Sequence, residues 1–357
     1  MNFTKNQLEL FEKVKEIFEE TPVYLVGGAV RSILMNKEPS DYDFCISIEP
    51  DYIESSIKSS GRRAYLTGKR FGTIGCKIDG KMIEVTTFRT EEYNKGNRKP
   101  IVSYIDSISE DLSRRDFSIN SMAVRIDNLK LIDQFNGQDD IKNKLIRCVG
   151  KPGLRFKEDP LRMLRAFRFS SQTGFNIEEG TFKSIKKKAY HILDISKERW
   201  VTELDKLLLG DNVENALKLL FESGLIKYMI PELNLQYNYD QNSKYHKLKL
   251  HEHTLKVVGL CPKDLNLKWA ALLHDIAKPF ARIDKWMGID GDKEHQELSE
   301  SYIKSNYPFH EVLGKEFIIK ISKYLKFSNE RTEVISDLVL NHLKDECELR
   351  KYDNLAK

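Results

Sequence analysis

Cysteine is scarce in this chain of 357 residues, and long apolar segments are missing. The cysteines are odd in number and scattered, without a C-x-x-C pair: Cys45, Cys76, Cys148, Cys261 and Cys347. This pattern argues against a disulfide framework. No apolar run reaches the length of a membrane span, and no apolar signal segment occurs near the first residue. We therefore expect a soluble, cytoplasmic protein of a reducing compartment, with no membrane partner.

The net charge is a modest +4, but the basic residues are unevenly distributed. Residues 142–199 contain 15 Lys and Arg against 6 Asp and Glu, a net charge of +9, which leaves −5 for the rest of the chain. A local excess of this size indicates a polyanionic partner such as a nucleic acid.

Two kinds of periodicity divide the chain. The first part contains an amphipathic helix and then short β-like runs, at residues 5–20 for the helix and at 23–27, 41–48, 63–66, 72–78 and 82–88 for the runs. Asp79-Gly80 predicts a hairpin turn between the last two runs. After Asp139 helical periodicity dominates, and strand-like alternation nearly vanishes. The pattern predicts an α+β fold, in which a head with a mixed β-sheet and helices precedes an all-α remainder.

We predict three domains from this pattern. Residues 1–140 form the head, residues 141–240 form a helical neck and body, and residues 241–357 form a helical domain rich in histidine. The polar stretch at residues 234–249 marks the second boundary, because it has few aliphatic side chains.

The most informative motif pairs two glycines with two carboxylates. Gly27 and Gly28 end an apolar run, and their bare backbone N–H groups can approach phosphate oxygens without interference from a Cβ atom. Arg31 follows on the first turn of the next helix. Asp41 and Asp43 lie two residues apart on a predicted strand, so both carboxylates project from one face and can bind one or two Mg²⁺ ions. The motif predicts a protein that transfers a nucleotide.

Three other segments support this prediction. Glu84, on the last predicted strand of the head, could approach Asp41 and Asp43 and help to deprotonate an attacking hydroxyl. Residues 114–120, Arg-Arg-Asp-Phe-Ser-Ile-Asn, offer groups suited to triphosphate oxygens and ribose hydroxyls.

The third segment, residues 158–165, is predicted to open a helix with a proline near its start. There Asp159 can accept a hydrogen bond while Arg162 donates one, and Arg165 lies a turn further on.

In order and spacing these motifs resemble those of the class II tRNA nucleotidyltransferases, the CCA-adding enzymes, and of their bacterial poly(A) polymerase relatives. The resemblance extends over about residues 20–345 and implies that Asp41 and Asp43 hold two catalytic Mg²⁺ ions, with Glu84 as a third catalytic acid. It also implies a set of nucleotide-binding residues: Gly27, Gly28, Arg31, Arg115, Asp116, Asn120, Asp159, Arg162 and Arg165.

The same resemblance implies an activity. The tRNA 3′-hydroxyl would attack the α-phosphate of CTP or ATP in line, adding C, C and A without a nucleic-acid template and releasing pyrophosphate. Asp159 and Arg162 would pair with the base edge of cytosine or adenine, while uracil and guanine would leave buried partners unpaired, at about 1–3 kcal/mol per group. Residues 90–102 are similar to a loop of the members that add the complete CCA, which makes CCA addition the leading interpretation.

Alternatives remain open at this stage. Residues 65–73 are similar to an element of poly(A) polymerases, so that activity stays a rival, as does addition of CC alone. Ser32 stands where the family usually has Asp, and this departure would slow turnover. A weakly active tRNA-binding protein with an HD phosphohydrolase domain is the alternative from another class. The sequence does not indicate an oligomeric state.

Most of the histidines lie between residues 246 and 342. Their pattern resembles the HD phosphohydrolase superfamily and implies a second divalent-metal site, formed by His253, His274, Asp275, His295 and His342. His246 could add to this site. The last ligand is an Asp in that superfamily, and in this sequence it is either Asp337 or His342. The alternative is a helical RNA-binding body with an incomplete metal site.

Overall fold

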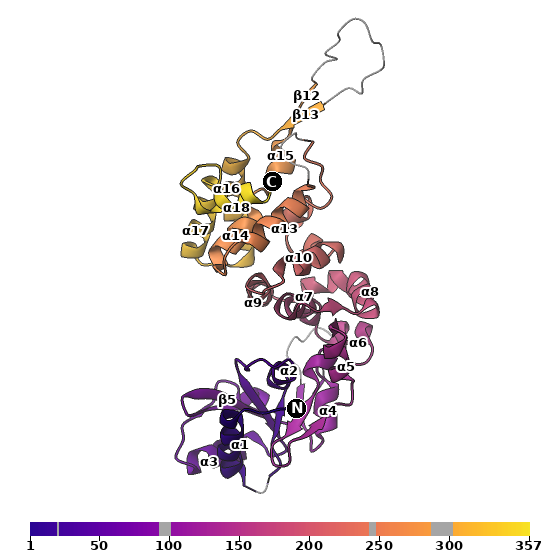
Figure 1. The fold of residues 1–357 in the computed structure, drawn as a ribbon, viewed down its shortest axis with the longest axis vertical. Coiled ribbons are helices and arrows are strands. Elements are labelled where there is room, and N and C mark those ends of the chain that lie inside the picture. Colours follow the sequence, from indigo (N-terminus) through magenta and orange to yellow (C-terminus); the bar gives the residue numbers. More distant parts are fainter. Residues whose placement is uncertain (20, 93–100, 243–247, 287–302) are drawn as a thin grey trace, which may run out of the picture. The chain divides into compact units, whose positions relative to one another are not determined.

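The structure, a computed structural model, describes residues 1–19, 21–92, 101–242, 248–286 and 303–357 (Figure 1). The chain forms two compact units. The first, which we call the head, comprises residues 1–159 and 176–181. The second, which we call the helical unit, comprises residues 160–175 and 182–357. The predicted α+β class is confirmed, and the predicted division into three domains stays a prediction.

A seven-stranded mixed sheet is the framework of the head, with strand order β3-β4-β5-β2-β1-β8-β9. Its strands are β1 (Tyr24–Val26), β2 (Tyr42–Ile46), β3 (Ala64–Tyr65), β4 (Thr73–Ile78), β5 (Lys81–Thr87), β8 (Ala123–Arg125) and β9 (Lys130–Ile132). β2 and β5 are parallel, and every other neighbouring pair in this sheet is antiparallel. Asp79 and Gly80 adopt φ values of 50° and 78°, which confirms the hairpin turn between β4 and β5.

Helices and a small hairpin complete the head. The helices are α1 (Lys5–Phe18), α2 (Gly28–Leu34), α3 (Pro50–Ser59), α4 (Ile108–Ser113), α5 (Gly137–Lys142) and α6 (Pro152–Glu158), and the hairpin joins β6 (Arg89–Glu92) and β7 (Ile101–Tyr104). Helix α1 begins at a capping box, because Thr4 accepts a hydrogen bond from the Gln7 N–H and the Gln7 side chain accepts one from the Thr4 N–H.

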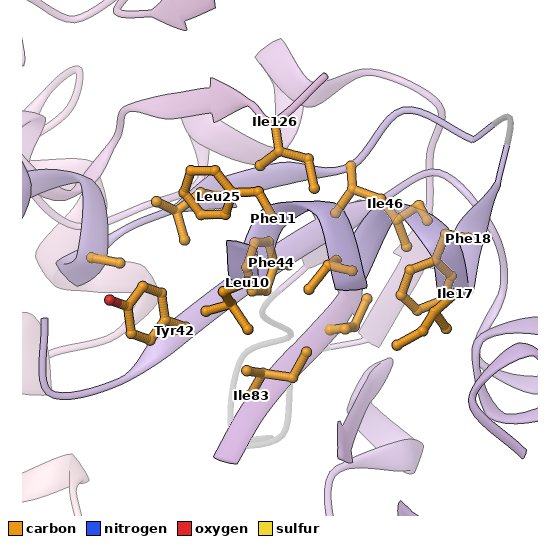
Figure 2. Close-up of a cluster of buried hydrophobic side chains, with 14 of the residues drawn as sticks. Leu10, Phe11, Ile17, Phe18, Leu25, Tyr42, Phe44, Ile46, Ile83 and Ile126 are labelled. Atoms are coloured by element: carbon orange, nitrogen blue, oxygen red, sulfur yellow. The ribbon is translucent and has the colours of Figure 1, made fainter. Parts of the chain in front are cut away.

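The apolar face of α1 forms the core of the head together with the central strands. Leu10 and Phe11 of α1 are buried beside Phe44 of β2 and Ile83 of β5 (Figure 2). The rings of Phe11 and Phe44 meet edge to face, with 6.3 Å between their centroids. This packing fixes β2, the strand that carries Asp43.

The helical unit contains most of the remaining elements. These are α7 (Leu161–Thr173), α9 (Lys197–Leu208), α10 (Val213–Glu222), α11 (Ile226–Met229), α12 (Pro231–Asn234), α13 (Leu250–Leu260), α14 (Leu265–Leu273), α15 (Lys278–Ala281), α16 (His310–Leu325), α17 (Asn329–Leu340) and α18 (Glu348–Leu355). Helix α8 (Glu179–Lys188) begins in the head and continues into this unit. Among the described residues, no helix is both long and apolar enough to span a membrane.

A polar junction connects three helices of this unit. The carboxylate of Asp205 in α9 accepts a hydrogen bond of 2.7 Å from the indole N–H of Trp269 in α14 and pairs with Arg331 of α17, also at 2.7 Å. Because Trp269 is fully buried, its N–H needs a partner of this kind.

Two short ladders depart from the predicted all-helical remainder. β10 (Leu145–Ile146) pairs with β11 (Asn176–Ile177) in the head, and β12 (Ile283–Trp286) pairs with β13 (Ile303–Asn306) in the helical unit. The first ladder is too short to show the period-2 alternation by which strands are recognised in a sequence.

Candidate active site and candidate metal centre

The sheet register brings two of the predicted catalytic carboxylates together. Asp43 of β2 and Glu84 of β5 are register partners on adjacent parallel strands, so their side chains leave the same face of the sheet. Asp41 lies just before β2 and is exposed. The negative charges of Glu84 and Asp41 both act on Asp43. Three hard oxygen donors at one edge suit a divalent cation such as Mg²⁺.

Burial and these neighbours shift the titration of Asp43. Burial, followed by the charge of Glu84, raises the pKa of Asp43 from 3.8 to about 6, although the guanidinium of Arg115 opposes the change. A bound cation would stabilise the ionised form, and protons would compete with it below about pH 6. The carboxylates of Asp43 and Glu84 are therefore of the type that a divalent metal prefers, although the oxygens of Asp41, Asp43 and Glu84 do not lie as close together as the ligand atoms of the groups described below.

The glycine turn lies beside this cluster. Gly27 adopts φ 68° and precedes α2, and its strand is paired with β2, with Val26 opposite Asp43. A Cβ atom on Gly27 would lie 3.1 Å from Nη1 of Arg115 and would also demand an unfavourable backbone conformation. On Gly28 it would meet Nη2 of Arg31 at 3.7 Å. Glycine at position 27 therefore lets the Arg115 guanidinium approach the backbone at this turn, whereas the 3.7 Å at Gly28 is an ordinary contact distance.

Three other predicted residues form a connected polar chain. Arg31 donates a hydrogen bond to Oδ1 of Asn120, and Nδ2 of Asn120 donates one of 3.2 Å to Oδ1 of Asp116. The same oxygen of Asp116 accepts the backbone N–H of Phe117 at 2.8 Å. Asp116 and Asn120 are buried, so these bonds fix their orientation.

One buried acid of the head, Asp111 of α4, was not predicted from the sequence. This carboxylate is fully buried and forms ion pairs with Arg114 at 2.6 Å and Arg115 at 3.0 Å. The signal in the sequence was an acid three and four residues before two arginines, the spacing at which side chains meet on a helix. The predicted contact of Arg115 with a ribose stays a prediction.

The residues predicted to select the base lie around a helix boundary. Helix α6 ends at Glu158, and Asp159 follows in an extended conformation, with ψ 100°. Pro160 explains this break, because the residue before a proline avoids the helical region. Arg162 and Arg165 lie on α7, where Arg162 is buried and Arg165 lies over the ring of Phe169 at 5.5 Å. The segment therefore opens α7 at Leu161, three residues later than predicted.

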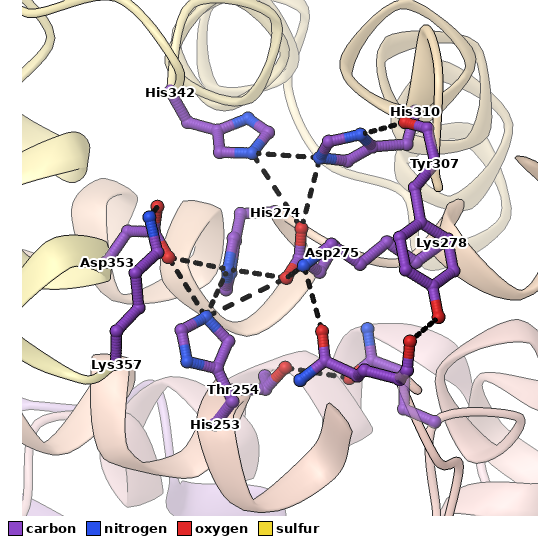
Figure 3. A network of polar contacts seen from close by, with 12 residues as sticks. His253, Thr254, His274, Asp275, Lys278, Tyr307, His310, His342, Asp353 and Lys357 are labelled. Atoms are coloured by element: carbon purple, nitrogen blue, oxygen red, sulfur yellow. Dashed lines mark hydrogen bonds and ion pairs between the residues drawn. The ribbon is translucent and has the colours of Figure 1, made fainter. Parts of the chain in front are cut away.

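A second cluster of ligand-type side chains is buried in the helical unit (Figure 3). Two groups of three could each hold a metal ion: His253, His274 and Asp353 in the first, and Asp275, His310 and His342 in the second. In each group the ligand atoms lie within 4.8 Å of one another. Four of the predicted ligands are thus brought together, while His295 and His246 lie outside the described residues.

Asp275 connects the two groups. Its Oδ2 lies 3.1 Å from Nε2 of His274, and its Oδ1 lies 3.3 Å from Nε2 of His310. Burial alone would raise the pKa of Asp275, but His274 and Lys278 hold it well below its ordinary value. Lys278 contributes through an ion pair of 2.7 Å to Oδ2.

The histidine tautomers also suit metal binding. Nδ1 of His310 lies 2.7 Å from the Tyr307 carbonyl, and Nδ1 of His342 lies 2.6 Å from the Val339 carbonyl. A carbonyl only accepts, so both Nδ1 atoms carry hydrogen, and neutral rings then direct their Nε2 lone pairs inward. Burial, followed by the charge of His274, lowers the pKa of His342 to about 4. The two Nε2 atoms are 3.3 Å apart, which requires a proton or a cation between them.

Two members of this cluster, His310 and Asp353, were not predicted, and of the two candidates for the last ligand the cluster contains His342. Asp353 on α18 lies 3.0 Å from Nε2 of His253, whereas Asp337 is exposed and pairs with Lys315. Sequence reasoning missed Asp353 because α18 carries several charged residues without a distinguishing pattern. His310 could have been found, since it belongs to the same group of histidines as the other ligands.

Two family models match parts of this chain. Residues 23–147 match the "Poly A polymerase head domain", the stretch that holds the glycine turn and the carboxylates. This stretch of the head is therefore similar to poly A polymerase head domains. Residues 174–236 match a second family, described as "Probable RNA and SrmB- binding site of polymerase A". Both matches end before the histidine cluster.

CCA-adding enzymes are among the relatives of this chain. A CCA-adding enzyme of Bacillus pumilus is 43% identical over 203 residues, which is 57% of this chain and 50% of the relative. One from Bacillus velezensis is 39% identical over 251 residues, 67% of this chain and 61% of the relative. The chain thus spans about half to three fifths of these relatives.

Solved structures extend the likeness to the fold. The CCA-adding enzyme of Bacillus stearothermophilus in complex with CTP has a TM-score of 0.61 and 30% identity, over 77% of this chain and 65% of that one. The apo form II of a CCA-adding enzyme has a TM-score of 0.65 over 99% of this chain, at 22% identity, and shows the shared fold alone. The predicted resemblance to the tRNA nucleotidyltransferases and poly(A) polymerases is confirmed.

The pKa of Asp43 predicts a cost in stability for the catalytic cluster. Because the pKa in the folded head lies above 3.8, folding takes up a proton between about pH 4 and 6, and the free energy of unfolding falls as the pH rises through this window. We expect Asp43→Asn to raise the thermal midpoint of the metal-free protein at about pH 7.5, with a smaller difference near pH 4. The measurement is thermal unfolding in a chelator across this pH range.

Asp106→Asn is the matched control, since this carboxylate is exposed, and it should leave the midpoint unchanged. An Asp43→Asn midpoint at or below that of the unmodified protein at neutral pH would contradict the expected cost.

Proposed function

We propose that this protein is a CCA-adding tRNA nucleotidyltransferase, which adds C, C and A to the tRNA 3′ end from CTP and ATP. The observation that carries the proposal is the pairing of Asp43 with Glu84 next to the Gly27 turn. This arrangement offers metal ligands and a phosphate-binding backbone at one edge of a sheet. The CCA-adding enzymes among the relatives and the structural neighbours support the choice of reaction.

The side chains of the head suggest how the reaction proceeds. Asp41 and Asp43 would hold divalent cations, which supply charge neutralisation for the phosphates and acidify the attacking hydroxyl. Glu84, the partner of Asp43 in the sheet, is exposed and is placed to take the proton from the 3′-hydroxyl. Arg31 and Arg115 line the glycine turn and would bind the triphosphate oxygens. The products are the extended tRNA and pyrophosphate.

Base selection belongs to Asp159 and Arg162 in this proposal. Cytosine and adenine each present an amino group beside a ring nitrogen, so one acceptor and one donor can pair with either base. Uracil and guanine present the opposite polarity and would leave a buried donor and acceptor unpaired. The burial of Arg162 supports this role, because an unsatisfied guanidinium is costly there.

The RNA partner is proposed to contact the basic stretch at residues 142–199. Within it, the last turn of α8 carries Lys186, Lys187 and Lys188. The match of residues 174–236 to a family described as a probable RNA-binding site supports the same surface. Contacts of this kind weaken steeply as salt is added.

A second candidate function rests on the buried cluster of the helical unit. We propose that its two groups of ligands bind two divalent cations that share Asp275, and that the site hydrolyses a phosphate ester. A cavity of about 190 Å³ supports this, because its wall includes Asp275, His310 and His342 together with two lysines, Lys278 and Lys357. Lysines beside metal ligands favour an anionic substrate.

The first test supplies the protein with Mg²⁺ and a tRNA transcript that ends at the discriminator base. With CTP alone we expect two additions, and with CTP and ATP three; products are resolved on a sequencing gel. Asp41→Ala or Asp43→Ala should abolish incorporation and leave tRNA binding nearly intact, because metal ligands are lost while the RNA-binding surface is not. A long A ladder would instead indicate a poly(A) polymerase, and appreciable activity of either variant would refute the assignment of metal ligands.

A second test concerns nucleotide choice. We expect Asp159→Ala and Arg162→Ala to reduce the preference for CTP and ATP over UTP and GTP by about tenfold, since removing a buried partner removes the penalty for leaving it unpaired. Single-nucleotide incorporation with each of the four triphosphates measures this preference. Lys157→Ala, an exposed cation nearby, is the control. Unchanged discrimination in both variants would rule out selection by these side chains.

A third test addresses the histidine cluster without relying on activity. After loading with Mn²⁺ or Zn²⁺ and dialysis, we expect Asp353→Asn and His310→Ala each to lose about one equivalent of metal per chain, and Asp275→Asn to lose both, because a ligand is missing. Elemental analysis measures the content. Asp337→Asn, an exposed acid, should retain full metal. Full retention by Asp353→Asn would show that the first group does not bind metal.

A further inference from the structure

Asp111 is a buried charge of the head to which the proposed mechanism gives no task. It lies on the short helix α4, its side chain is fully buried, and it is surrounded by donors from several segments. Burial alone would raise the pKa of Asp111, but Arg115 and Arg114 more than offset it and hold the group ionised.

Each carboxylate oxygen of Asp111 accepts hydrogen bonds from a different arginine. Oδ1 accepts Nε and Nη2 of Arg114 at 3.0 and 2.6 Å, and it also accepts the backbone N–H of Arg89 at 3.3 Å. Oδ2 accepts Nε and Nη2 of Arg115 at 3.3 and 3.0 Å. Two-point contacts of this type fix both the position and the plane of each guanidinium.

The held guanidinium of Arg115 reaches the catalytic strands. Its Nη2 lies 3.4 Å from Sγ of Cys45, which shares a face of β2 with Asp43. Its Nη1 lies where a Cβ atom on Gly27 would be only 3.1 Å away. Arg115 is therefore wedged between the glycine turn and the strand of the metal ligands, and its side chain is 17% exposed.

Stability alone does not account for this arrangement. Burying an ion pair usually brings little net stability, since desolvation of the charges offsets their attraction. The arrangement instead holds Arg115 in place beside the Gly27 turn. A side chain with this much rotational freedom would otherwise lose entropy each time a nucleotide bound.

We propose that Asp111 is a positioning residue for nucleotide binding: its carboxylate holds the Arg115 guanidinium against the Gly27 turn, so that guanidinium and backbone meet the triphosphate as one preformed site. The inference rests on the proposed nucleotidyl transfer and deepens it. Asp111 itself touches neither the nucleotide nor the metal.

A positioning role predicts a specific change in the kinetic constants KM and kcat. With Asp111→Asn, Arg115 keeps its charge but loses its ionic anchor, so the KM for CTP should rise about tenfold while kcat at saturating CTP changes less than about threefold. A merely structural defect would reduce the fraction of active protein, which lowers kcat and leaves KM unchanged.

The experiment measures KM and kcat for CTP on a tRNA transcript, with the full chain, for Asp111→Asn, Arg115→Ala and the double variant. Because Asp111 acts through Arg115, we expect the double variant to resemble Arg115→Ala and not to show the product of the two effects. Glu110→Gln is the control on the same helix, since that side chain is exposed, and it should match the unmodified protein. Asp111→Glu, which keeps the charge, should recover part of the loss.

The outcomes separate the two proposals. If the unmodified protein does not transfer nucleotides, the proposed function fails, and this inference fails with it. If transfer is normal but Asp111→Asn leaves the KM for CTP unchanged, or if the double variant shows fully multiplied effects, the positioning role alone is overturned. If the Asn variant does not fold, an unchanged KM for Arg115→Ala overturns it.

Discussion

The pairing of β2 with β5 is the constraint on which the head depends. It places Asp43 and Glu84 side by side, although two carboxylates at such positions repel, and the raised pKa of Asp43 records that repulsion together with burial. The sheet tolerates this because the strands are held from the other side by the packing of α1 on Phe44 and Ile83. The fold thus maintains an electrostatically unfavourable cluster that a cation would relieve.

The buried cluster of the helical unit follows the same principle with different side chains. His310 and His342 direct their Nε2 atoms toward one another, and backbone carbonyls hold the opposite nitrogen of each ring. Helices α13, α14, α16, α17 and α18 converge there, so the ligands come from elements spread over about a hundred residues of sequence. In both units, like groups are brought together by secondary structure that is stabilised elsewhere.

Much of the head could be predicted from the sequence, and the reasons are local. Residues close to one another in the sequence determine the glycine turn, the Asp79-Gly80 hairpin and the alternating runs. For this reason α1, β1, β2, β4 and β5 were located correctly. Strands β8 and β9 are as short as β1 and were missed because, unlike β1, they are not followed by a glycine turn that marks them in the sequence. The ion pair between Asp111 and Arg115 follows from their spacing on a helix. The approach of Arg115 to Gly27 depends instead on how the strands pair.

The histidine cluster was predicted less completely, for a physical reason. His253, His274 and Asp275 belong to recognisable motifs, whereas Asp353 becomes a neighbour of His253 only when α18 packs against the rest of the unit. Such a ligand is defined by tertiary structure alone. No local pattern separates it from exposed acids such as Asp337.

The junction at Asp205 fixes the spacing of three helices of the helical unit. It connects α9 to α14, which ends at Leu273 directly before His274 and Asp275, and to α17, which ends at Leu340 two residues before His342. Because one carboxylate serves both partners, loss of Asp205 would leave the buried Trp269 N–H and the Arg331 guanidinium without this acceptor at the same time. The helix ends next to the histidine ligands are therefore held in part by a polar contact that lies outside the ligand cluster.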